Sequence, residues 1–107
     1  MSESELAVVA DNPSSNRYEL HAGESLAGFA QYVRRGGRTF FVHTEIDPSF
    51  EGQGFGTALV RGALDHERAA GTLIVPLCPF VRTYIERHPE YSDLVDAPMV
   101  AKIDNEG

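Results

Sequence analysis

The segment at residues 51–57, E-G-Q-G-F-G-T, sets glycines at every second position: Gly52, Gly54 and Gly56. An apolar run typical of a strand precedes it, and a periodic run typical of a helix follows it. A strand, a glycine turn and a helix start together can hold an anion on backbone N–H groups. Without side chains at the glycines, phosphate oxygens could approach the amides from Gln53 to Thr57, where the helix dipole adds to the attraction. A tight turn that binds no ligand is the alternative.

The glycine spacing departs from two better-known phosphate fingerprints. A dinucleotide-binding turn needs G-x-G-x-x-G, and Leu59 stands where the third glycine would be. A Walker loop needs Gly-Lys-Ser/Thr, and the segment contains no lysine. If the segment binds an anion, it is neither a dinucleotide-binding turn nor a Walker loop.

Cys78 and His43 are the side chains best suited to chemistry. Cys78 precedes Pro79 at the expected start of a helix, and a helix N-terminus favours the nucleophilic thiolate. His43 lies near the end of an expected strand, where a neutral imidazole would be a suitable base for an amine or a thiol. Each also has a structural interpretation: the cysteine as a small buried hydrophobe, the histidine as a packed, hydrogen-bonded strand residue.

The composition restricts the class of protein. With 107 residues we expect a single domain at 1–107, with its core at about 6–95 and a loose C-terminal tail at 101–107. A net charge of -7 and a pI of about 4.9 disfavour nucleic-acid binding. No apolar stretch approaches the roughly 20 residues of a membrane helix, and the acidic N-terminus is not a secretory signal. A single cysteine cannot form an internal disulfide, so we expect a cytoplasmic protein.

Hydrophobic patterning predicts an α+β fold. Four strands in an antiparallel meander come first, at 6–10, 17–22, 25–35 and 38–46. On the last of these, strict alternation would place Phe41, His43 and Glu45 on the face opposite Thr44 and Ile46.

The second half of the chain changes to helical spacing. A helix from Phe55 to the stop signal at Gly71 leads to an apolar strand at 72–77, and a further helix begins at Pro79 and ends before Pro89. The result is a mixed, mostly antiparallel sheet with a parallel strand–helix–strand crossover and a C-terminal helix.

These motifs in this order resemble the GNAT acyltransferase superfamily. There the segment R/Q-x-x-G-x-G/A cradles the pyrophosphate of acyl-coenzyme A; Gly54 and Gly56 match its small positions, and Glu51 stands where Arg or Gln is usual. Together with P-L-C-P-F-V-R-T-Y-I-E-R-H-P-E-Y at 76–91, the pattern looks like the small single-domain YjdJ-type GNAT proteins, over roughly residues 17 to 95. Those proteins lack the helical pair between the first two strands of larger GNATs.

This resemblance implies a minimal GNAT fold in which two neighbouring parallel strands splay apart and bind the pantetheine arm as an additional strand. The implied contacts of acetyl-coenzyme A are Glu45, Ile46, Gln53, Gly54, Phe55, Gly56, Thr57, Pro79 and Tyr84. Tyr84 occupies the helix where many GNATs place a tyrosine that protonates the departing thiolate; packing in the core is its alternative.

The function implied by the resemblance is acetyl-coenzyme A dependent transfer of an acetyl group to an amine. Attack could be direct, with His43 or a water as base, or could pass through an acyl-Cys78 intermediate. A non-catalytic acyl-coenzyme A binding or sensing module is the alternative. The acceptor would be a small-molecule amine or a protein lysine, which an acidic surface attracts. We expect no metal, nucleic-acid or membrane partner, and we allow for a weak homodimer.

Overall fold

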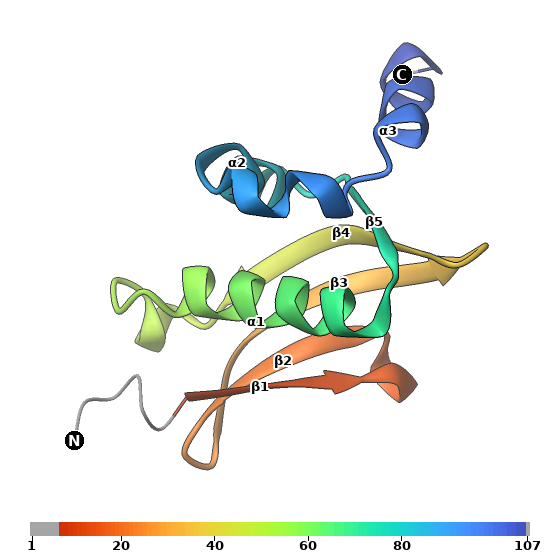
Figure 1. Cartoon of the computed structure of the whole chain (residues 1–107). Coiled ribbons are helices and arrows are strands. Elements are labelled where there is room, and N and C mark those ends of the chain that lie inside the picture. Colours follow the sequence, from red (N-terminus) through yellow and green to blue (C-terminus); the bar gives the residue numbers. More distant parts are fainter. Residues whose placement is uncertain (1–6, 107) are drawn as a thin grey trace.

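The computed structural model describes residues 7–106, which form one five-stranded sheet with helices packed against it (Figure 1). The strands are β1 (Ala7–Asn12), β2 (Arg17–Ala22), β3 (Ser25–Arg35), β4 (Arg38–Ile46) and β5 (Leu73–Pro76). The α-helices are α1 (Phe55–Ala70), α2 (Pro79–Arg87) and α3 (Ala97–Glu106), and short 3-10 turns lie at η2 (Pro13–Ser15), η3 (Pro48–Phe50) and η4 (Pro89–Leu94).

The strands lie in chain order across the sheet, β1-β2-β3-β4-β5. The first four pair antiparallel, and β5 pairs parallel to β4 after the α1 crossover. This arrangement confirms the predicted fold class. The bounds of β2, β3 and β4 agree with the hydrophobic patterning; β1 extends two residues further than expected, to Asn12, and Leu6 lies outside the described residues.

Helix α1 begins and ends at glycines in the left-handed conformation. Gly54 is its N-cap with φ 76°, and Gly71 is its C-cap with φ 71°. A side chain in this region of φ costs roughly 1–2 kcal/mol, which glycine avoids. The two glycines therefore fix the length of the helix from the sequence alone, as predicted.

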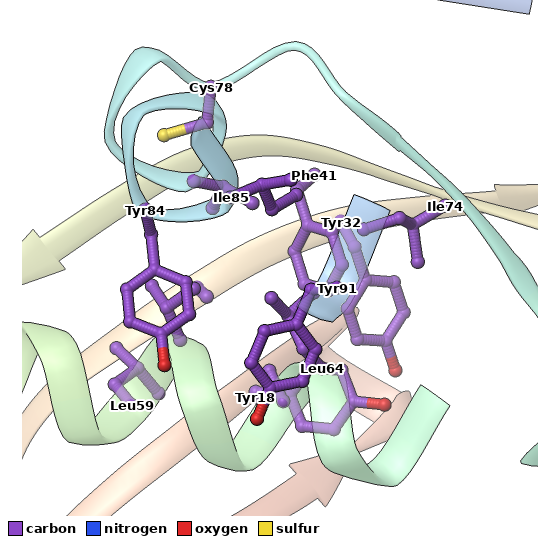
Figure 2. Close-up of a cluster of buried hydrophobic side chains, with 14 of the residues drawn as sticks. Tyr18, Tyr32, Phe41, Leu59, Leu64, Ile74, Cys78, Tyr84, Ile85 and Tyr91 are labelled. Atoms are coloured by element: carbon purple, nitrogen blue, oxygen red, sulfur yellow. The ribbon is translucent and has the colours of Figure 1, made fainter. Parts of the chain in front are cut away.

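One hydrophobic core lies on the sheet face that α1 and α2 cover (Figure 1). Its side chains come from β2 to β5 on one side and from the two helices on the other (Figure 2), and they include Tyr18, Leu20, Tyr32, Phe41, Leu59, Leu64, Ile74, Val81 and Ile85. Among the described helices only α1 contacts β2 and β3 extensively, so the opposite face of these strands has no helical cover of its own.

A β-bulge in β4 changes which side chains face the core. Gln31 pairs with His43, but Tyr32 pairs with Phe41, so Val42 is an extra residue on β4. An extra residue shifts the alternation of side chains by one position. Phe41 is therefore buried in the core on the same face as Thr44, and the prediction that it shares a face with His43 was wrong.

Strands β4 and β5 separate after a short parallel ladder. Their pairing runs from Arg38 opposite Leu73 to Phe41 opposite Pro76. The carbonyl of Phe41 then accepts from the amides of both Leu77 and Cys78, at 3.0 and 2.9 Å. Beyond this point the described chain gives β4 no partner strand on that side, which is the splay that the resemblance implied.

The C-terminal segment differs from the prediction. We expected a loose tail at 101–107, and the structure continues α3 through this segment to Glu106; Gly107 lies outside the described residues. Helix α3 projects away from the sheet (Figure 1). It is attached at its start by Asp96, whose side chain accepts from the amide of Met99 and from Arg38 of β4.

Candidate functional site

The glycine turn is held in place by Asp47, the residue that follows β4. The Asp47 amide donates to the Ala27 carbonyl of β3 at 2.8 Å, and its carboxylate accepts from the amide and hydroxyl of Ser49. These bonds from Ser49 hold the pKa of Asp47 below its usual range. The turn therefore starts from a fixed point at the end of the sheet and delivers Gly52 and Gly54, both at positive φ, to the start of α1.

The first turn of α1 presents free backbone donors. Its first internal hydrogen bond runs from the Ala58 amide to the Gly54 carbonyl at 3.1 Å. The amides of Phe55, Gly56 and Thr57 precede that ladder, and Gly54 offers no capping side chain. Such a helix start attracts an anion through both its N–H groups and its dipole.

A cavity of about 400 Å³ leads from this helix start to the exposed edge of β4. Its wall is built from the end of β4, the glycine turn, the start of α1 and three aromatic side chains, and consists of Thr44, Ile46, Phe50, Glu51, Gly52, Gly54, Phe55, Gly56, Thr57 and Phe80. This volume falls in the range of small-molecule sites. The combination of anion cradle, cavity and free strand edge fits the pyrophosphate and pantetheine parts of an acyl-coenzyme A.

The predicted cofactor residues divide into three groups in the structure. Five of them line this cavity: Ile46, Gly54, Phe55, Gly56 and Thr57. Pro79 and Tyr84 line a neighbouring cavity, described below. Gln53 is exposed in the turn, and the side chain of Glu45 lies on the other face of β4, so a contact from either would have to come from its backbone.

Cys78 lies behind the wall of the cavity rather than in it. It is the N-cap of α2, it is 4% exposed, and its thiol donates to the Thr44 hydroxyl at 3.4 Å. Figure 2 shows it at the start of α2, above the core. Thr44 itself lines the cavity, so the cysteine is one side chain away from the space where a thioester would lie.

His43 lies on the opposite face of the sheet from Cys78. Its imidazole is 3.3 Å from a carboxylate oxygen of Glu45, and both side chains are more than half exposed. Its ring also packs beside Phe29, at 6.2 Å between centroids. The structure thus does not bring His43 and Cys78 together, because successive residues of a strand point to opposite faces and Cys78 contacts the side of Thr44.

A second cavity of about 400 Å³ lies between the start of α1 and α2. Thr57, Pro79, Phe80, Thr83, Tyr84, Arg87 and His88 line it. The side chain of Tyr84 points from α2 toward Leu59 of α1 (Figure 2). Its ring stacks on the imidazole of His88, with 4.2 Å between the ring centroids. Burial raises the pKa of Tyr84, so its hydroxyl stays protonated at neutral pH and can donate.

Sequence reasoning missed several residues that line these cavities. Thr44 and Phe50 border the first, Thr83, Arg87 and His88 border the second, and Phe80 borders both. The helical period of 79–88 places Phe80, Thr83, Tyr84 and Arg87 within one turn-spaced stripe, which is a usable signal. Only the packing of α2 against the start of α1 shows that this stripe faces a cavity.

Comparison with known proteins agrees with this geometry. The sequence profile described as GCN5-related N-acetyl-transferase matches residues 17–94. No curated protein matches the chain. The solution structure of a protein from Staphylococcus aureus, named as a "GCN5-like putative N-acetyltransferase", superposes with a TM-score of 0.64 at 22% sequence identity, over 89% of this chain and 90% of that one.

The fold and the site therefore define an α+β domain of the GNAT class. The chain belongs to the GCN5-related N-acetyltransferase family, whose profile spans most of its length. Proteins of this class use acetyl-coenzyme A as co-substrate. Within residues 7–106, no helix has the length and apolar character needed to cross a membrane.

Proposed function

We propose that this protein transfers an acetyl group from acetyl-coenzyme A to a primary amine by direct attack on the thioester. One observation carries the proposal: the cavity is continuous from the free amides at the start of α1 to the unpaired edge of β4. Family membership supports the reaction class. The identity of the amine, the direct route and the roles of individual residues are proposals.

The backbone of the chain does most of the binding in this proposal. The amides of Phe55, Gly56 and Thr57 bind the pyrophosphate, and the free edge of β4 near Ile46 pairs with the pantetheine arm. Glu51 lines the same cavity with a negative charge, where the family usually has Arg or Gln. Backbone donors therefore have to supply the attraction for phosphate without help from position 51.

The separation of His43 from Cys78 supports direct transfer over an acyl-cysteine route. In the direct route the amine nitrogen bonds to the thioester carbon, the C–S bond breaks, one amine proton goes to a base, and the thiolate takes a proton from a donor. An amine that approaches from the open face of the sheet meets His43 and Glu45, which are both exposed there. On the cofactor side of the sheet, Tyr84 carries a protonated hydroxyl, and this hydroxyl is the proposed proton donor to the thiolate.

A non-catalytic acyl-coenzyme A binding module is the second candidate. Two observations keep it open: Glu51 stands where the family usually has Arg or Gln, and the open face of β2 and β3 has no helical cover in the described chain to enclose an acceptor. The two candidates differ in turnover and not in cofactor binding.

Native mass spectrometry with acetyl-coenzyme A, followed by turnover assays on an amine panel, tests the proposal. We expect one cofactor bound per chain, no acetyl group left on the protein, and acetylation of a polyamine or a lysine peptide. A chain that binds the cofactor but acetylates no amine would be a binding module. A chain that binds no coenzyme A would overturn both candidates.

A further inference from the structure

Phe80 occupies the space directly above the phosphate cradle. It is the second residue of α2 and is 45% exposed, although it is a large apolar side chain. A Cβ atom built on Gly56 would lie 2.7 Å from the Cζ atom of the Phe80 ring. The tip of the ring thus fills the place that a side chain at position 56 would take.

Position 56 therefore has no room for a side chain while the Phe80 ring stays in this place. Gly52 and Gly54 have positive φ, which favours glycine by conformation, whereas Gly56 has an ordinary helical backbone. The Phe80 ring lies where its side chain would be, and in the proposed function a phosphate approaches its amide. Both cannot occupy the same space at once.

The ring also divides one cleft into two cavities. Phe80 and Thr57 are the residues that the two cavities share, one from each helix. On one side of Phe80 lie the glycine turn and Thr44; on the other side lie Tyr84, Arg87 and His88. If the ring moved aside, the cleft would be continuous from β4 to the C-terminal half of α2.

We infer that Phe80 is a cofactor-contacting gate: its ring covers the phosphate cradle in the free protein and turns aside when acyl-coenzyme A binds. The inference rests on the proposed function for the identity of the ligand. A helical Phe has two accessible χ1 rotamers, so the ring can change position without any movement of α2. Displaced from Gly56, the ring forms the wall of the opened cleft beside the cofactor.

The gate predicts a specific effect on binding rates. A ligand that binds only the open state has its affinity and its association rate reduced by the fraction of open molecules. If the ring is closed in about nine molecules of ten, that reduction is about tenfold. Phe80→Ala is therefore expected to speed association of coenzyme A by about 3- to 10-fold, measured by surface plasmon resonance, even if it also speeds dissociation through lost contact.

The chain contains no tryptophan, so Phe80→Trp provides a single fluorescent reporter at the gate. Addition of coenzyme A is expected to shift the emission of this variant. The control is Val8→Trp, because Val8 is 59% exposed on β1 at the other edge of the sheet; its emission should not change. Gly56→Ala in the Phe80→Trp background should displace the ring and move the emission of the free protein toward that of the bound state.

Calorimetry on the same samples separates a failed gate from a failed function. If coenzyme A binds to Phe80→Trp but neither the ligand nor Gly56→Ala changes the emission, the ring does not move and the gate is wrong. An unchanged or slower association rate for Phe80→Ala would overturn it equally. If the wild-type protein binds no coenzyme A, the proposed function is wrong and the gate falls with it.

Discussion

The two ends of helix α1 have opposite chemistry. Near its C-terminus, Glu67 is fully buried, yet its carboxylate accepts from Tyr18, from Thr39 at 2.6 Å and from Arg34 at 2.9 Å. At its N-terminus, Gly54 offers no side chain, and the first amides have no partner within the helix. One end is a completed polar network and the other is a set of donors that a ligand could complete.

The buried network ties the helix to several strands at once. Through Arg34 of β3 it continues to Asp11 of β1 at 3.0 Å and to Tyr32 at 2.9 Å. A buried charge is tolerated only when such partners satisfy it. Helix α1 is therefore fixed at the end far from the glycine turn, and its other end can keep its backbone donors exposed without loss of position.

The largest effect is expected at the buried end. Glu67→Ala should destabilise the fold by about 3–5 kcal/mol, because it leaves Arg34 and the Tyr18 hydroxyl without their partner. Urea unfolding measures the loss, with Glu86→Ala on the exposed face of α2 as a control within about 0.5 kcal/mol. Glu67→Gln, which keeps the shape, should cost less. A loss below 1 kcal/mol for Glu67→Ala would mean that the network does not anchor the helix.

The next largest effect is expected on the open face of the sheet, where His43 of β4 lies. His43→Ala should slow acetyl transfer by roughly 10²–10⁴, the usual value of a positioned base, without changing coenzyme A binding. Cys78→Ala should keep most of the activity, because its buried thiol bonds to Thr44 and not to His43. Steady-state kinetics on both variants decide the route. Loss of turnover in Cys78→Ala, with a trapped acetyl-cysteine in the wild type, would establish the acyl-enzyme route instead.

The two glycine caps of α1 form a matched pair. Gly54→Ala and Gly71→Ala each place a side chain at positive φ and should each destabilise the fold by about 1–2 kcal/mol. Only Gly54→Ala should weaken coenzyme A binding, by about tenfold or more, because only its end of the helix carries the cradle. Calorimetry and urea unfolding on both variants test this. Equal effects on affinity would show that helix stability, and not the cradle, controls binding.

The smallest effect concerns alkaline pH. Burial raises the pKa of Tyr18 and of Tyr32, and their carboxylate partners Glu67 and Asp11 add to the effect. A raised pKa in the folded state means that this stability is fully present below pH of about 10 and is lost as the pH rises further. The loss should be about 1.4 kcal/mol per pH unit for each tyrosine. Measured by urea unfolding at a series of pH values above 10, the free energy of unfolding should fall less steeply with pH for Tyr18→Phe than for the wild type. The same pH dependence in both proteins would contradict the assignment.

Local sequence patterns predicted most of the fold because each pattern has its own physical cause. Positive φ at Gly54 and Gly71 requires glycine, so the ends of α1 could be read directly. Alternating apolar residues and glycine turns gave the bounds of β2, β3 and β4. The tail was mispredicted because α3 depends on a tertiary attachment, the contact of Asp96 with Arg38 and the start of the helix.

The candidate site was predictable in its backbone and not in its side chains. The glycine turn follows from local conformation, and the parting of β4 from β5 was expected from the family resemblance. The face of His43 depends on the bulge at Val42, which arises from pairing with β3 and has no signal in the alternating pattern.

The sequence by itself thus determined the elements, their order and the glycine turn at the start of α1, since short-range sterics and hydrogen bonding decide those. Only the tertiary structure decided which side chains meet. It separated His43 from Cys78 across the sheet, buried Glu67 in a network of four strands, and laid Phe80 over Gly56. Those contacts join residues distant in the chain, and packing of whole elements fixes them, so no local pattern could encode them.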